Sequence, residues 1–114
     1  MLISMSRIKK HHEIDFATRL IADWRSMAVA HAVYENSPVR YTDLSNMLDF
    51  SPTILSQKLM QLTNIGIIDR IQKDGSKEVL YSSKPITNKM VKAYHILEDI
   101  EHELVNKYKK QEVA

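Results

Sequence analysis

Apolar residues recur at three- and four-residue intervals between Ile14 and Glu35. This spacing is typical of a helix that buries one face, and it leaves room for a single break. The stripe consists of Ala17, Leu20, Ile21, Trp24, Met27, Ala28 and Ala32. The run 35–38 should end the helix, because the residue before Pro38 disfavours helical angles and Asn and Ser favour turns.

Two shorter helices are predicted next, separated by a tight turn. Residues 39–41 are extended in character, and Thr42 is suited to cap a short helix. Ser51 and Pro52 mark the sharpest helix start in the chain, because serine accepts from free backbone amides and proline fills the first position at no hydrogen-bond cost. We expect this second helix to end at Gly66. Its inward face carries Ile54, Leu55, Leu59 and Leu62, and that of the short helix carries Leu44, Met47 and Leu48.

Beyond Gly66 the spacing of apolar residues changes from about 3.6 to about 2, which predicts β-strands. The two strand-like runs, 67–72 and 78–81, flank an Asp-Gly pair at 74–75. Such a pair favours a hairpin turn, because the turn needs positive φ angles that Gly and Asp tolerate. The sequence therefore predicts a two-stranded hairpin with a basic tip.

A last helix of roughly twenty residues is predicted from Thr87, which is a plausible cap. The middle of one face carries Met90, Tyr94, Leu97, Glu101, Leu104 and Tyr108, and Ala93, Ile100 and Val105 widen it. This apolar arc is wider than one small domain needs to bury against itself. A partner helix could therefore cover the remainder, with those first six residues at the interface.

The composition limits the chemistry of the chain. A length of 114 residues with 44% hydrophobic content suits one domain with one core. There is no cysteine, which excludes disulfides, thiolate zinc sites and thiol-based redox sensing. Because no apolar run approaches the length of a membrane span and the first ten residues lack the apolar region of a signal peptide, we expect a cytoplasmic protein with no membrane association.

Charge is divided unevenly along the chain. Residues 36–92 contain eight basic against five acidic residues, whereas residues 93–106 contain four acidic residues and no Lys or Arg. Such a division would present one end of the molecule to phosphate and keep the other away from it.

The order of the predicted elements is that of a winged helix-turn-helix, mainly α-helical with a small β-hairpin (α+β). In this fold the second helix of the motif lies in the major groove and contacts base edges. Here that recognition helix spans 51–65, with no Asp or Glu between 51 and 68, and the wing at 72–78 would lie on the DNA backbone. We divide the chain into an N-terminal arm (1–13), a winged helix-turn-helix domain (14–86) and a C-terminal dimerisation helix (87–114).

The same residues resemble the HxlR group of winged-helix regulators, which is related to the MarR and PadR types. The resemblance rests on the recognition helix with Ser51-Pro52, Leu55-Ser56, Leu59 and Leu62, on Gly66-Ile67-Ile68 followed by Arg70, on Trp24, on Arg40-Tyr41-Thr42-Asp43-Leu44, and on Val79-Leu80-Tyr81. It covers about residues 23–105. In two respects the chain departs from the group: Ala22-Asp23 replaces a Gly-Lys pair, and the N-terminal cysteine of many members is absent.

The resemblance implies a homodimer joined through terminal helices that binds double-stranded DNA with two recognition helices in successive major grooves. In that geometry Thr53, Ser56 and Gln57 would read bases, Lys58 would contact a base or a phosphate, and Gln61 shares their face. The remaining contacts would be phosphate contacts by Arg40 in front of the motif and by Lys73 and Lys77 in the wing.

Other functions are less well supported by the sequence. His95, Glu98, Asp99 and His102 have metal-ligand spacing on one helix face, but that face is opposite Leu97 and Leu104, so we predict no metal site and no cofactor. The chain has no Gly-rich elbow, no phosphate loop and no paired carboxylates in an apolar setting, so we do not expect an enzyme. A small-molecule effector is left open.

The serious rival is a winged-helix module that binds a protein instead of DNA, because a fold does not fix a function. The distinguishing feature is the surface around the recognition helix. If Arg40, Lys58, Lys73 and Lys77 form one continuous basic surface with residues 53–61, the DNA hypothesis gains. If Asp43, Asp69 or Asp74 interrupts that surface, the rival gains.

Overall fold

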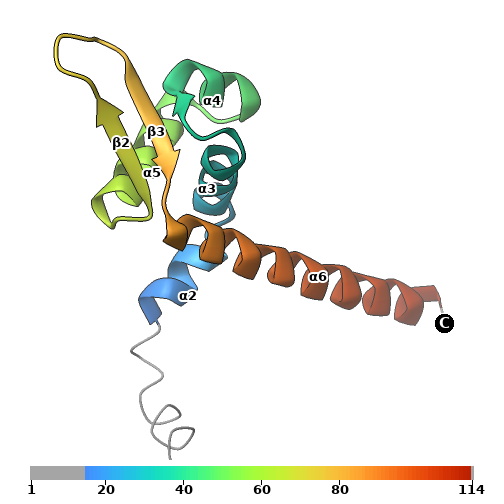
Figure 1. The fold of residues 1–114 in the computed structure, drawn as a ribbon. Coiled ribbons are helices and arrows are strands. Elements are labelled where there is room, and N and C mark those ends of the chain that lie inside the picture. Colours follow the sequence, from blue (N-terminus) through green and yellow to red (C-terminus); the bar gives the residue numbers. More distant parts are fainter. Residues whose placement is uncertain (1–14, 114) are drawn as a thin grey trace, which may run out of the picture.

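The structure, a computed structural model, describes residues 15–113, so the arm predicted at 1–13 lies outside this range. Its elements are α2 (Asp15–Ala22), α3 (Trp24–Asn36), β1 (Val39–Arg40), α4 (Tyr41–Met47), α5 (Pro52–Asn64), β2 (Ile68–Gln72), β3 (Val79–Ser83) and α6 (Pro85–Val113). Figure 1 shows α3, α4 and α5 gathered beside the small sheet, with α6 extending away from them. Among the described residues, no helix has both the length and the apolar composition needed to cross a bilayer.

The first predicted helix is broken once, at Asp23, into α2 and α3. Asp23 has extended backbone angles and caps α3, because its carboxylate accepts a hydrogen bond from the Arg25 amide at 3.2 Å. The core lies mainly under α3, whose buried residues include Met27, Val29 and Val33. Trp24 is a correction to the predicted buried stripe, since it is 53% exposed and packs against Phe50 at the surface.

Helix α5 begins and ends as the sequence predicts. The Ser51 hydroxyl accepts from the Ile54 amide at 3.2 Å, and Pro52 occupies the first helical position. At the other end Gly66 has a φ of 83°, and the Ile67 amide donates to the Leu62 carbonyl at 2.9 Å. This left-handed glycine closes the helix because it lets the last carbonyls find donors.

Helix α4 differs from the prediction at its start. Arg40 is the capping residue and makes no side-chain capping bond, whereas Thr42 lies inside the helix. The predicted Thr42 cap is therefore wrong.

The predicted hairpin is part of a three-stranded antiparallel sheet with the order β1-β3-β2. Along β3, Tyr81 pairs with Arg70 of β2 on one side and with Val39 of β1 on the other. Gly75 in the connecting loop has the predicted positive φ, at 78°, but Asp74 does not, because no described residue other than glycine has a positive φ. The short strand β1 ties the start of α4 to the base of the wing.

Thr87 joins α6 to the core in a way that the sequence does not show. The helix begins two residues earlier, at Pro85, so Thr87 is not the residue that precedes it. Its hydroxyl is fully buried, accepts from the Lys84 amide at 2.9 Å and donates to the Ile67 carbonyl at 2.5 Å. The side chain thus satisfies a free amide at the helix start and fixes α6 to the end of α5.

Candidate nucleic-acid interface

The exposed face of α5 carries polar side chains of the kind that read DNA. Thr53, Ser56, Gln57 and Gln61, the predicted contacts of this helix, are all exposed. The opposite face packs into the core through Leu55, Leu59 and Leu62. Because α5 contains no acidic residue, nothing on this helix would repel phosphate.

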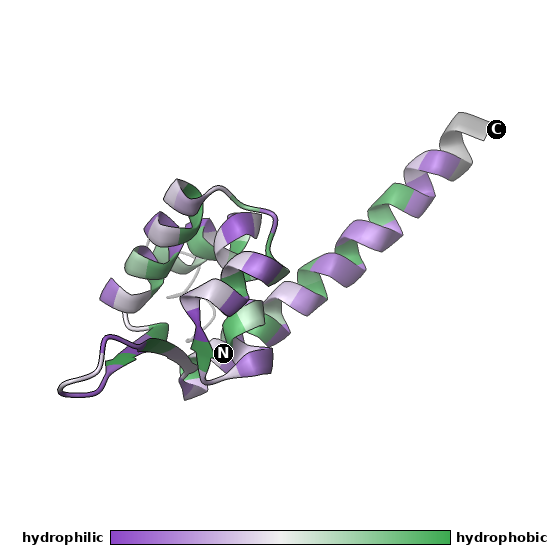
Figure 2. Ribbon diagram, turned by 90° about the horizontal axis from the view of Figure 1, so that it is seen from above, coloured by the Kyte–Doolittle hydropathy of each residue, from purple (hydrophilic) through white to green (hydrophobic). Residues whose placement is uncertain are grey.

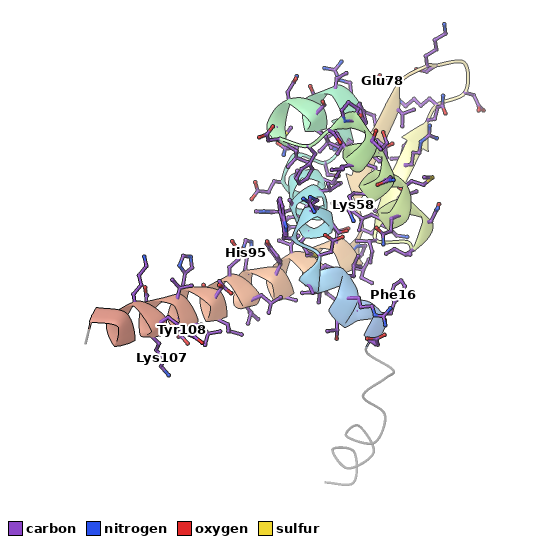
Figure 3. The ribbon with its side chains drawn as sticks, turned by 180° about the vertical axis from the view of Figure 1, so that it is seen from behind. Phe16, Lys58, Glu78, His95, Lys107 and Tyr108 are labelled. Atoms are coloured by element: carbon purple, nitrogen blue, oxygen red, sulfur yellow. The ribbon has the colours of Figure 1, made fainter. Side chains whose placement is uncertain are left out.

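Lys58, which we predicted to contact DNA, forms an ion pair with Asp23 in the structure. Its ammonium lies 2.5 Å from an Asp23 carboxylate oxygen, and its side chain is only 21% exposed (Figure 3). The helix spacing explains this position, because Lys58 lies three residues after Leu55 and four before Leu62, both buried. Lys58 therefore flanks the core-facing side of α5 and is bound to Asp23, and its contact with DNA stays a prediction.

Asp23 is the centre of this cluster. Besides capping α3 and binding Lys58, its carboxylate accepts a hydrogen bond at 2.8 Å from the hydroxyl of Ser26, which is fully buried. Burial raises the pKa of the Asp23 carboxyl, but the hydrogen bonds from Lys58 and Ser26 and the charge of Lys58 outweigh burial and lower the pKa below 3.8. The group is therefore ionised at neutral pH.

Arg40 is exposed, but two acidic residues share its charge. Its guanidinium lies 3.2 Å from an Asp43 carboxylate oxygen and 4.0 Å from one of Glu78, which Figure 3 labels beside the wing. At the opposite edge of the sheet, on β2, a carboxylate oxygen of Asp69 lies 3.8 Å from the Lys84 ammonium. Acidic side chains therefore interrupt the basic surface next to α4, whereas Asp69 is paired with a lysine that we did not assign to DNA.

The wing carries the two predicted lysines without acidic partners. Lys73 and Lys77 lie in the loop between β2 and β3 and are exposed, and within the described residues neither forms an ion pair. The loop is shaped by its own backbone, since the Ser76 amide donates to the Lys73 carbonyl at 3.0 Å. Both ammonium groups are free to meet phosphate.

Two further residues near α5 were not assigned to the DNA interface from the sequence. Met60 is 60% exposed on the face that carries Ser56, from which it is four residues away. Arg70 is exposed on β2 and has no acidic partner in the described part of the chain. Both line a cleft of about 290 Å³ between α5 and the sheet, together with Tyr41 and Tyr81. The helix spacing predicts Met60 on the outward face of α5, but the position of Arg70 beside it depends on strand register.

The four α6 residues that have metal-ligand spacing are only partly brought together. His95 Nδ1 lies 2.9 Å from a Glu98 carboxylate oxygen, and the His95 ring meets the edge of His31 at 5.1 Å between centroids. No group of three or more candidate ligands within residues 15–113 has a geometry that would hold a metal ion.

Several solved structures share the fold of this chain. The transcriptional regulator ytfH of Salmonella typhimurium matches with a TM-score of 0.67 at 21% identity over 86% of this chain and 89% of that one. This is a winged helix-turn-helix fold. A SlyA-like transcription regulator from Listeria monocytogenes matches with a TM-score of 0.65 at 15% identity, covering 92% and 73% of the two chains. MepR, a transcription regulator of the Staphylococcus aureus multidrug efflux pump MepA, matches with a TM-score of 0.61 at 17% identity, covering 94% and 84%. The sequence matches no protein-family model and no curated protein.

Attached to this winged helix is an exposed apolar face on α6. Every residue from His95 to Lys109 is exposed, and Figure 2 shows hydrophobic and hydrophilic positions alternating along this part of the helix. Of the predicted dimer residues, Leu97, Glu101, Leu104 and Tyr108 are exposed and Tyr94 is half-buried. Met90 is the exception: it is 8% exposed and belongs to the core of its own chain, because the first turns of α6 pack on α3.

Helix α2 extends the apolar face, which the sequence analysis did not foresee. Ile21, Ala22 and Leu97 line two adjoining hollows between α2 and α6. One of them, of about 480 Å³, is completed by Ala17, Thr18, Ala93 and Ile96. Apolar residues of the two helices thus adjoin in one surface. Both helices lie on the side of the molecule away from the wing (Figure 1).

Proposed function

We propose that this protein is a transcriptional regulator that reads double-stranded DNA as a homodimer and acts in the cytoplasm. The observation that carries the proposal is the acid-free polar face of α5 beside a wing with two unpaired lysines. In this arrangement α5 enters the major groove and the wing follows the backbone. The similar structures support it, since three of them are described as transcription regulators. Within this class, the Ser51-Pro52 start of α5 and the strand that follows Gly66 favour the HxlR group.

Each side chain has a distinct part in this proposal. Thr53, Ser56, Gln57 and Gln61 read base edges, because hydroxyl and amide groups both donate and accept there. Lys73 and Lys77 contact phosphates and supply affinity that is independent of sequence. Arg40 keeps its predicted role as a phosphate contact at the front of the motif, shared with its acidic neighbours.

The apolar surface of α2 and α6 supports the proposed homodimer. Ile96, Leu97, Ile100, Leu104, Val105 and Tyr108 are all exposed on α6. Contiguous apolar surface of this kind marks an interface, because a monomer in water gains nothing by exposing it. A second copy would offer the same surface in return, as a two-fold interface requires.

The test is fluorescence anisotropy with labelled duplexes, including the region upstream of the protein's own gene, at several salt concentrations. We expect one duplex to be preferred over random sequence and the affinity to fall linearly in log salt. Gln57→Ala should reduce the preference, and Lys73→Ala should weaken binding to all duplexes and lower the salt slope by about one. Lys107→Ala, on the far part of α6, is the control and should bind as the wild type does.

The rival function, a protein-binding winged helix, is favoured by one observation. Asp43 and Glu78 both approach Arg40, so the basic surface is not continuous. If the wild-type chain binds no duplex at about 50 mM salt, where non-specific phosphate contacts should already be visible, the DNA proposal fails and the rival replaces it.

A further inference from the structure

Asp23 and Lys58 connect two elements that are far apart in the sequence. They are 35 residues apart, one at the start of α3 and the other in the middle of α5. Their side chains are 30% and 21% exposed, so water only partly screens the pair. The contact lies on the side of α5 that faces the body of the protein, away from Thr53 and Gln57.

The Asp23 carboxylate is itself held firmly. One oxygen accepts from the Arg25 amide, and the other accepts from the Ser26 hydroxyl and the Lys58 ammonium. Because two of these donors belong to the first turn of α3, the carboxylate is a fixed point of that helix. The position of the Lys58 side chain is therefore fixed relative to the start of α3.

We propose that Asp23 is a positioning residue for DNA reading, acting through Lys58 to set the rotation of α5 about its own axis. Lys58 then contributes to sequence preference without touching DNA. The inference rests on the proposed function, because it assigns a role to residues behind the reading face of α5.

The need for such a contact follows from the packing of α5. Leu55, Leu59 and Leu62 bury its inner face, but apolar burial is non-directional and tolerates small rotations of the helix. Ser56 and Gln57 directly precede Lys58, so a rotation that moves Lys58 moves both readers away from their base edges. A directional ion pair on the flank of the helix resists that rotation.

The proposal and the simpler alternative, in which Lys58 meets a phosphate, differ in their salt dependence. Each phosphate contact that is lost lowers the slope of log affinity against log salt by about one. A positioning contact is not made with DNA, so its loss leaves that slope unchanged. It weakens binding to the preferred duplex and spares binding to random sequence.

The experiment compares Lys58→Met, Asp23→Asn and the double variant with the wild type by anisotropy. Methionine retains an unbranched stem without the charge, and asparagine still caps α3 but cannot form the ion pair. We expect each single variant to lose roughly five- to twentyfold in affinity for the preferred duplex, and the double variant to lose no more than either, as residues in direct contact do. Lys58→Arg, which keeps the charge, should restore most of the affinity.

Three results would overturn the inference while leaving the proposed function intact. They are a salt slope lowered by about one in Lys58→Met, wild-type preference in Asp23→Asn, and additive losses in the double variant. Unfolding followed by Trp24 fluorescence verifies that each variant is folded in the binding assay. If the wild type binds no duplex, the proposed function and this inference both fail.

Discussion

Two polar side chains, Asp23 and Thr87, hold together parts of the protein that apolar packing alone would leave loosely oriented. Asp23 joins α3 to α5, and Thr87 joins α6 to the chain that leaves α5. Each is fully provided with hydrogen-bond partners, and no described buried side-chain polar atom lacks one. Removal of one partner from such a cluster is costly, because the other group stays buried without a bond.

The Asp23 cluster should make stability depend on acid. Its folded pKa lies below 3.8, so the stabilisation is complete above that pH and is lost as the pH falls through the lowered folded value. We expect the difference in unfolding free energy between wild type and Asp23→Asn to be largest near pH 6 and to shrink below pH 3.8. Urea unfolding monitored by Trp24 fluorescence measures it. A difference that stays constant over this range would contradict the assignment.

Thr87→Val tests the buried hydroxyl. The substitution keeps the shape of the side chain but leaves the Ile67 carbonyl and the Lys84 amide without their partner. We expect a loss of about 1–3 kcal/mol in the free energy of unfolding. Thr42→Val, at an exposed threonine, is the matched control and should change it by less than about 0.5 kcal/mol. Equal losses in the two variants would remove Thr87 from its assigned role.

Among the elements, α5 is the best defined by its own sequence. Its start, its end and its buried face all depend on residues within 51–67, so local chemistry suffices to fix them. A helix of this kind presents its polar face with little dependence on the rest of the chain. Only its rotation relative to α3 requires a distant residue.

A pair of serine substitutions tests the capping of α5. Ser51→Ala removes the acceptor of the Ile54 amide and should cost about 1 kcal/mol in unfolding free energy. Ser56→Ala, on the same helix but in its exposed interior, should be neutral or slightly stabilising because alanine is the better helix former. Thermal unfolding by circular dichroism compares the two. The cap assignment fails if both variants melt together.

The sequence predicts the features that neighbouring residues determine. Ser51, Gly66 and Gly75 all take the conformations expected of them, because capping and positive φ are local requirements. The winged-helix fold and the break in the first helix follow from the same kind of information.

Features that depend on contacts between distant segments could not be predicted. In the sequence, Lys58 resembles an ordinary exposed polar residue, and only the fold brings Asp23 beside it. Met90 likewise has the spacing of an outward face, but the fold covers it with α3. The third strand has the same origin, since Val39 and Arg40 become a strand only by pairing with β3. The DNA and dimer assignments themselves are still predictions.

At the scale of the whole molecule, the proposed DNA-reading end, called here the reading end, is separated from an apolar end. The wing and α5 lie at one end, and the exposed part of α6 points away from them (Figure 1). The acidic residues Glu98, Asp99, Glu101 and Glu103 lie on this far part of α6, so the acidic stretch of the sequence lies away from the wing and α5. DNA bound at the reading end would leave the apolar face free for a second copy.

Leu104→Glu tests that face. The side chain is exposed in the single chain, so a glutamate there leaves the fold intact but places buried charge in the proposed dimer interface. We expect the wild type to sediment as a dimer and the variant as a monomer in analytical ultracentrifugation. Ile71→Glu, at an exposed isoleucine on β2, is the control and should remain dimeric. A wild type that is monomeric at the highest concentration tested would refute the homodimer.

The exposed part of α6 also determines how steeply the protein would respond to its own abundance. From His95 to Lys109 every side chain is exposed, so packing within its own chain stabilises this part of the helix little. Pairing of two copies through this segment would be an equilibrium governed by mass action. At low abundance the paired form rises with the square of the chain concentration, so a twofold change in synthesis would produce a larger than twofold change in operator occupancy.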